Sequence, residues 1–187
     1  IQSSGNGLLG LIDEILDLSK IEAGKMELEL IDISTKEITE VLKDLFTEVA
    51  KERNIEFKIE AQDAPLVIKT DKMRVEQILK NLISNAIKFT SEGSVTLHVS
   101  KDPKDEKQIL FAVKDTGIGI PREKQYNIFE AFQQADGSTK RKYGGTGLGL
   151  SISRELAKLL KGEITLKSAV NQGSTFTLRI PIIGSSF

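Results

Sequence analysis

Apolar positions recur along this chain with two periods, and the clearest helical pattern lies near its centre. Between Asp71 and Thr90, apolar residues repeat at the spacing of one helix face; they are Val75, Ile78, Leu79, Leu82, Ile83 and Ala86. Asn81, Asn85 and Lys88 follow one another at intervals that place them on a second stripe, which borders the apolar face. The pattern therefore predicts a core helix with a polar stripe along its edge.

The rest of the chain divides into helical and strand patterns. Helical spacing predicts further helices at 8–24, 35–53 and 148–160, and a short helix at 122–130. Alternation of apolar and polar residues predicts strands at 55–60, 66–68, 95–99, 109–113, 164–166 and 176–180, with a polar loop at 101–107. Ser34 and Glu37 have the spacing of a capping box for the second helix. Antiparallel strands with helices to one side indicate an α+β fold, a two-layer α/β sandwich with a mixed, mostly antiparallel sheet.

The first predicted helix, at 8–24, has a wider apolar surface than a lone surface helix needs. Leu9 and Leu16 extend the stripe formed by Leu8, Leu11, Ile12, Ile15, Leu18 and Ile21. Such a helix packs against partners on more than one side, as in a bundle or coiled coil. No second bundle helix is evident in this chain, so we expect its partner to lie in a missing helix or a second subunit.

Composition excludes several classes of chemistry. The 187 residues include 26 Lys+Arg and 27 Asp+Glu, which leaves no basic excess for nucleic acid or an anionic membrane. With no Cys and one His, neither disulfides nor a structural zinc site is expected. No apolar run approaches the roughly 18 residues of a membrane span, and a signal-peptide pattern is missing. We expect a cytosolic domain, and the initial Ile1 indicates a fragment whose parent protein could still be membrane-anchored.

Several polar and glycine-rich segments indicate a magnesium nucleotide site. Asn oxygens are neutral ligands suited to Mg²⁺, and Lys88 can offset phosphate charge. Glycines Gly144, Gly145, Gly147 and Gly149 precede a helix, which allows backbone N–H groups to approach phosphate closely. Asp115 only accepts hydrogen bonds, which favours the amine of adenine over the carbonyl of guanine. Taken singly, each feature also has a simpler explanation: capping amides, a solvated lysine and a strand-to-loop turn.

Five motifs, taken together, resemble the catalytic ATP-binding domain of sensor histidine kinases. They are Asn81…Asn85…Lys88, Asp115-Thr-Gly-Ile-Gly119, Phe129…Phe132, Gly145-Thr-Gly-Leu-Gly149 and Gly173-Ser-Thr-Phe176. The segment LIDEILDLSKIEAGKMEL resembles the second helix of that family's dimerisation domain and the linker after it. The resemblance implies a partial dimerisation helix at 1–24 and a catalytic domain of the Bergerat ATP-binding type at 25–187.

This resemblance also implies the ligands and the role of each site residue. ATP and Mg²⁺ would be bound, with Asn85 as the metal ligand and Asn81, Asn85 and Lys88 as the catalytic residues. Phe89 would pack near the adenosine, and Asp115 would bind the adenine amine in a pocket shaped by Gly117 and Gly119. The remaining implied contacts lie in a lid and its flanks: Lys140, Arg141, Lys142, Gly145, Thr146, Gly147, Leu148, Gly149 and Thr175. Phe129 and Phe132 would anchor the lid by packing, and the polar loop 133–146 would be mobile. The basic residues of the lid also fit a solvated charge run.

The phosphoacceptor histidine of the family has no counterpart here. The single histidine, His98, lies on the polar side of a predicted strand. The resemblance therefore implies a fragment that takes its acceptor from a histidine-containing dimerisation domain of the same protein. It also implies a homodimeric full-length kinase and a response-regulator receiver domain as the downstream partner.

Two other functions stay open at this stage. ATPases of this fold, and serine kinases of the anti-sigma type, are disfavoured by Asn81, which stands where gyrase-type ATPases have a water-activating Glu. A regulatory module that binds nucleotide without catalysis is disfavoured by the completeness of the motifs.

Overall fold

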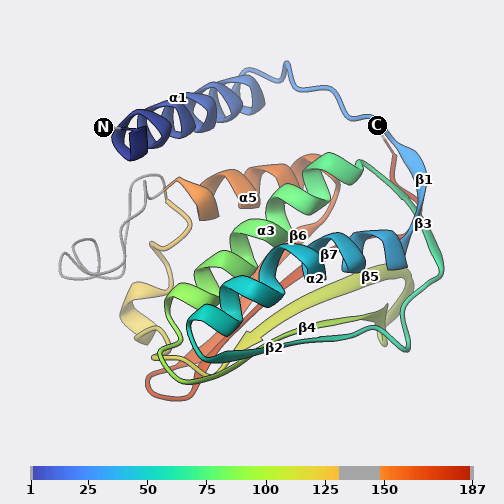
Figure 1. Ribbon diagram of the computed structural model, residues 1–187. Helices are drawn as coiled ribbons and strands as arrows, with labels where there is room; N and C mark the ends of the chain where they lie inside the picture. The colour runs from blue at the N-terminus through green and yellow to red at the C-terminus, as the bar shows by residue number, and fades with distance from the viewer. Residues whose placement is uncertain (1, 131–147, 186–187) are drawn as a thin grey trace.

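The computed structural model describes residues 2–130 and 148–185, with residues 2–8 as backbone only. Its helices are α1 (Gln2–Glu22), α2 (Thr35–Glu52), α3 (Lys72–Lys88) and α5 (Gly149–Leu159), with a 3-10 turn η1 (Arg122–Lys124). Its strands are β1 (Ile31–Ser34), β2 (Ile55–Glu60), β3 (Val67–Thr70), β4 (Gly93–Asp102), β5 (Asp105–Asp115), β6 (Glu163–Ala169) and β7 (Gly173–Pro181). Helices α2, α3 and α5 lie side by side over one face of the main sheet, and α1 lies above α5 (Figure 1).

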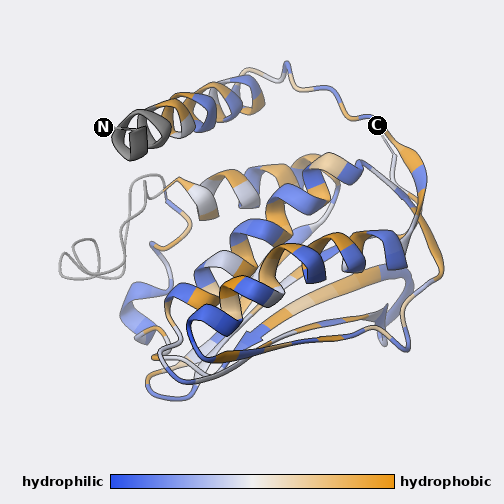
Figure 2. Cartoon of the chain, in the orientation of Figure 1, coloured by the Kyte–Doolittle hydropathy of each residue, from blue (hydrophilic) through white to orange (hydrophobic). Residues whose placement is uncertain are grey.

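The main sheet has five strands in the order β2-β4-β5-β7-β6. Only β2 and β4 run parallel, and the other neighbours are antiparallel. Alternate residues of β4, β5 and β7 point toward the helices and are buried: Val95, Leu97, Val99, Ile109, Phe111, Val113, Phe176, Leu178 and Ile180. Apolar residues accordingly recur along β5 and the helices above it (Figure 2). The predicted two-layer α+β class, with a mostly antiparallel sheet and a preceding helix, is confirmed.

Helix α3 lies in the middle of the helix layer. Its predicted apolar face is 0–4% exposed throughout. Asp71 caps the helix, because its Oδ1 accepts a hydrogen bond from Arg74 N at 3.1 Å. Asp71 Oδ2 also accepts from Glu29 N at 2.9 Å, which fixes the linker after α1 to the start of α3. The stripe that carries the candidate site therefore stands on a rigid, capped core helix.

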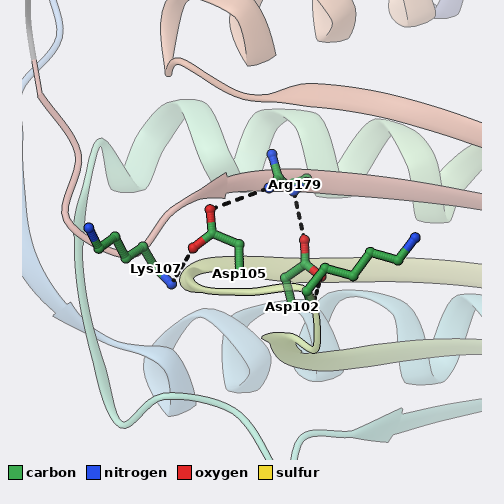
Figure 3. A network of polar contacts seen from close by, with 5 residues as sticks. Asp102, Asp105, Lys107 and Arg179 are labelled. Atoms are coloured by element: carbon green, nitrogen blue, oxygen red, sulfur yellow. Dashed lines mark hydrogen bonds and ion pairs between the residues drawn. The ribbon is translucent and has the colours of Figure 1, made fainter.

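The predicted polar loop at 101–107 is wrong. Strands β4 and β5 continue through it and turn at Pro103 and Lys104. Arg179 on β7 donates through Nε to Asp102 at 2.8 Å and lies 3.6 Å from Asp105 through Nη2 (Figure 3). Two of the charged residues that suggested a polar loop, Asp102 and Asp105, lie within ion-pair distance of a strand far away in sequence, so the local pattern gave no sign of this pairing.

Three local predictions also differ from the structure. Strand β1 was missed; it forms a separate two-stranded sheet with β3 and has only one buried residue, Ile33. Residues 122–130 form a single 3-10 turn and further turns in place of a helix. Ser34 is the N-cap residue of α2, yet its side chain makes no capping hydrogen bond.

Helix α1 is only partly covered. Leu11, Leu18 and Ile21 pack against the core. A second group stays 42–62% exposed: Leu9, Ile12, Ile15 and Leu16. Asp17 accepts a hydrogen bond from Gln77 Nε2 of α3 at 3.2 Å, which orients α1 over the domain. Among the described helices, α1 included, none combines the length and apolarity needed to cross a membrane.

Candidate functional site

The polar stripe of α3 lies at the edge of the core, as predicted. Asn81, Asn85 and Lys88 are all half-buried, and they extend over about 10 Å of helix. Asn81 Nδ2 donates to Ser153 Oγ of α5 at 3.1 Å. Ser153 is 2% exposed, so the Asn81 amide is held in one orientation by a buried partner. The carbonyl oxygen of Asn81 therefore points away from Ser153.

That oxygen faces the beginning of α5. A Cβ built on Gly149, the first residue of α5, would lie 2.3 Å from Asn81 Oδ1. Only glycine allows the α5 backbone to approach α3 this closely. The first N–H groups of a helix have no partner within it and carry a partial positive charge, and the N-cap residue Leu148 has an apolar side chain that cannot cap them. The end of α5 beside Asn81 is therefore suited to an anion such as phosphate.

Asp115 stands at the end of β5 and is 5% exposed. Its Oδ1 accepts hydrogen bonds from Gly117 N at 2.9 Å and Ser174 N at 3.3 Å. Burial raises the pKa of Asp115 above its ordinary value, and the two N–H donors oppose this shift only in part. Because Oδ1 has two donors and Oδ2 has none among the described residues, Oδ2 is free to accept from a ligand amine.

The segment after Asp115 is packed against the C-terminal end of α3. A Cβ on Gly117 would lie 2.2 Å from the carbonyl oxygen of Phe89, and Ile118 N donates to that same oxygen at 3.3 Å. Gly119, at φ 73°, approaches Ala169 O so closely that its Cβ would lie 2.0 Å away. Both glycines thus permit close backbone contacts. The stripe of α3 has the N-terminus of α5 at its Asn81 end and the Asp115 segment at its Lys88 end.

Sequence reasoning missed the side chains that hold this segment in place. Ser168 Oγ accepts from Ile120 N at 2.8 Å and is 2.8 Å from Ser174 Oγ. Gln125 Nε2 donates to Ile120 O at 2.8 Å and to Ser168 O at 3.1 Å. A serine on an edge strand and a glutamine in an irregular segment carry no periodic signal, so only the fold reveals them.

The other predicted residues fall into three groups. Phe129 packs edge-on against Phe176, with ring centroids 6.1 Å apart. The guanidinium carbon of Arg154 lies 5.9 Å from the centroid of the Phe129 ring. Thr175 alternates with Ser174 and lies on the sheet face opposite the helices, away from α3. The remainder lie outside the described residues, as does the predicted mobile loop: Phe132, Lys140, Arg141, Lys142, Gly144, Gly145, Thr146 and Gly147.

Comparison with known proteins identifies the family of this chain. Residues 70–183 match the family model of the histidine kinase-, DNA gyrase B- and HSP90-like ATPases. The chain belongs to this family. It is 44% identical over 184 residues to the circadian input-output histidine kinase CikA of Synechococcus elongatus, covering 97% of this chain and 24% of CikA. It is 42% identical to the autoinducer 2 sensor kinase/phosphatase LuxQ of Vibrio vulnificus, covering 96% of this chain and 22% of LuxQ.

Solved structures of this ATPase family show the same fold. Full-length ShkA in complex with AMPPNP superposes with a TM-score of 0.87 at 30% identity, over 99% of this chain and 38% of ShkA. Histidine kinase ThkA in complex with the response regulator protein TrrA superposes with a TM-score of 0.70 at 26% identity, over 93% of this chain and 48% of that one. The chain spans 22–24% of the length of the two curated relatives, LuxQ and CikA. It is an ATP-binding catalytic domain of the histidine-kinase type.

Proposed function

We propose that this domain binds ATP with Mg²⁺ along the stripe of α3 and transfers the γ-phosphate to a histidine of a dimerisation domain. One observation carries the proposal: the stripe of Asn81, Asn85 and Lys88 runs from the N-terminus of α5 to the Asp115 segment. ATP would lie along it with its phosphates at α5 and its adenine at Asp115. Phe89, Gly117 and Gly119 would form the adenine end of the site.

The amides of this stripe fit a magnesium ion. Asn85 is half-buried, and its side chain makes no hydrogen bond to another described residue. Its carbonyl oxygen is a hard, neutral ligand, and Mg²⁺ commonly takes only one or two protein ligands beside phosphates and water. We assign the metal to Asn85, with Asn81 beside the phosphates and Lys88 as a phosphate contact. When bound, the ion would neutralise phosphate charge.

The transfer needs a nucleophile from outside this chain. In the proposed reaction an imidazole nitrogen forms the N–P bond while the bond from the γ-phosphorus to the β,γ-bridging oxygen breaks, and ADP leaves. His98 does not fit this role, because it lies on the open face of the sheet, 3.2 Å from Glu60. An amide such as Asn81 cannot take a proton from water. Hydrolysis should therefore be slow compared with transfer to histidine.

The partners of the full protein follow from this reaction. We infer that the first helix of the dimerisation domain packs on the exposed apolar residues of α1 and carries the acceptor histidine in a homodimer. The phosphate would then pass to an aspartate of a receiver domain, in line with the ThkA complex with a response regulator. Because the reaction consumes cellular ATP, we place this domain in the cytoplasm of the cell, including the case of a membrane-anchored parent.

A labelling experiment in trans tests the function. The domain is mixed with a helical hairpin bearing the acceptor histidine, γ-labelled ATP and Mg²⁺. We expect label on the hairpin with the wild type, a loss of about 100-fold with Asn85→Ala, and normal transfer with the control Lys80→Ala, which is exposed on the same helix. Steady ATP hydrolysis without labelling would favour a conformational ATPase. Tight ATP binding with neither activity would favour a regulatory module.

A further inference from the structure

A row of side chains crosses the open face of the main sheet, opposite the helices. The strand registers place its members next to one another in the order Lys58, Thr96, Lys114, Thr175 and Lys167. Lys114, Thr175 and Lys167 lie on three adjacent strands, β5, β7 and β6. Strand spacing separates the two lysine backbones by about 9.5 Å, with Thr175 between them.

These two lysines differ from the other cations of this face. Lys58 lies 3.3 Å from Glu56, His98 lies 3.2 Å from Glu60, and Arg179 pairs with Asp102. Lys114 and Lys167 have no ion-pair partner within residues 2–130 and 148–185. The positions two residues away along the three strands carry no acid either: Ala112, Thr116, Thr165, Ala169, Gly173 and Thr177. The positive charge here is therefore not neutralised by neighbours on the sheet.

Both lysines line a hollow of about 300 Å³. Most of the remaining wall comes from β6, β7 and the turn between them: Ser168, Ala169, Gln172, Gly173, Ser174 and Thr175. Asp115 also belongs to the wall, but its carboxylate lies on the helix side of the sheet, where Gly117 N and Ser174 N donate to it. The hollow is open to solvent, with a volume at the lower end of that of small-molecule sites, and its side chains offer hydrogen-bond donors and positive charge.

We propose that this hollow binds a small phosphate monoester as its dianion. Two ammonium groups match two negative charges, and lysine binds phosphate as a point charge on a flexible stem. The hydroxyl of Thr175 and the amide of Gln172 add neutral donors. A monocarboxylate would neutralise only one lysine. This site is separate from the ATP site, since the stripe of α3 lies on the other side of the sheet, and it does not depend on kinase activity.

The test is a backbone NMR titration of the nucleotide-free domain with inorganic phosphate and with glycerol 3-phosphate. Sodium chloride of the same ionic strength is the reference, because salt screens exposed charges without binding a site. We expect saturable shifts at Lys114, Lys167 and Thr175 with both phosphates and none with chloride. The Lys114→Gln/Lys167→Gln double variant should weaken this binding at least about 10-fold. The matched control is Lys58→Gln, in the same row but paired with Glu56, and it should leave the affinity unchanged.

Several results would overturn the proposal. One is that sodium chloride causes the same NMR shifts as phosphate. Another is that Lys58→Gln weakens phosphate binding as much as the double variant does. A third is that an acidic peptide saturates the site while neither phosphate does. Thermal melting checks that the double variant stays folded, as expected for two exposed lysines. Phosphate shifts confined to α3 and abolished by Asn85→Ala would assign the binding to the nucleotide site and refute a second site. Persistence of the Lys114 and Lys167 shifts in Asn85→Ala supports it, whatever the outcome of the histidine-labelling experiment.

Discussion

Gly149 stands so close to Asn81 that a Cβ on it would lie 2.3 Å from Asn81 Oδ1. This contact joins the N-terminus of α5 to the stripe of α3 without any side chain between them. The amide of Asn81 is held from the other side by Ser153. Asn81 therefore has little freedom to move aside, and the glycine has a positional role that helix propensity alone would oppose.

The first prediction concerns Gly149→Ala. The added methyl group must displace Asn81, and a misplacement of about 1 Å in a phosphoryl-transfer site can reduce the rate about 100-fold. We expect that loss in histidine labelling together with a somewhat lower melting temperature, because the helix propensity gained with alanine does not offset the displacement of a side chain that has little room to move. The control is Gly10→Ala in α1, where a new Cβ meets nothing within 4 Å and activity should be retained. Normal labelling by Gly149→Ala would contradict the assigned role of Asn81.

The second prediction concerns Asn81→Glu. A carboxylate at this position can accept a proton from water, which an amide cannot do. Steady ATP hydrolysis should rise more than the Kd for ATP changes. The Ser153 hydroxyl, which accepts from Asn81 in the wild type, can rotate to donate to the new carboxylate. Phosphate release and nucleotide binding by calorimetry measure the two effects. Unaltered hydrolysis together with strongly weakened binding would argue against the placement of the γ-phosphate near Asn81.

The third prediction concerns Asp115→Asn. Gly117 N and Ser174 N can still donate to the remaining oxygen, which turns the new NH2 group toward the adenine amine. Replacing an acceptor by a donor should weaken ATP binding about 10- to 100-fold. Stability should not fall at neutral pH. The raised pKa of Asp115 means that its ionised form is disfavoured in the folded protein, and the variant removes this cost.

The pH dependence of ATP affinity in the wild type and in Asp115→Asn gives an independent check. Since burial raises the pKa of Asp115 above its ordinary 3.8, the carboxylate should begin to take up a proton at a higher pH than an exposed aspartate. The wild type should therefore lose ATP affinity on acidification, and Asp115→Asn should lack that loss. Titrations with ATP between neutral pH and pH 4.5 compare the two. Parallel curves would exclude Asp115 as the group that binds adenine.

The fourth prediction concerns Asp102→Asn. The hydrogen bond from Arg179, followed by that from Lys104 N, lowers the pKa of Asp102 below 3.8. Its contribution to stability is thus present above pH 4 and is lost as the pH falls through the lowered value. The melting temperature of the variant should be slightly lower than that of the wild type at pH 7, and this difference should disappear in strong acid. The matched control Asp105→Asn, at 3.6 Å from Arg179, should have the smaller effect. An equal gap at all pH values would show that the ion pair is not its cause.

Much of the helix layer and of the candidate site could be predicted from local pattern. Helix α3 has a 3.6-residue apolar period, an aspartate at its N-cap and a polar stripe at the edge of its apolar face. Both the helix and its candidate ligands can therefore be predicted from this segment alone. The alternation in β2 and β4 was equally clear. In the segments 101–107 and 31–34, by contrast, the partners lie far away in sequence: Arg179 pairs with Asp102 across 77 residues, and β1 pairs with β3.

The amphipathic helices, the alternating strands and the glycine-rich segments can be predicted from the chain alone, because each depends on residues a few positions apart. The contact of Gly149 with Asn81, the support of the Asp115 segment by Ser168 and Gln125, and the position of Thr175 beside Lys114 and Lys167 emerge only in the folded molecule. Strand register and helix packing set which face of an element a residue occupies, and both arise from contacts between distant parts of the chain.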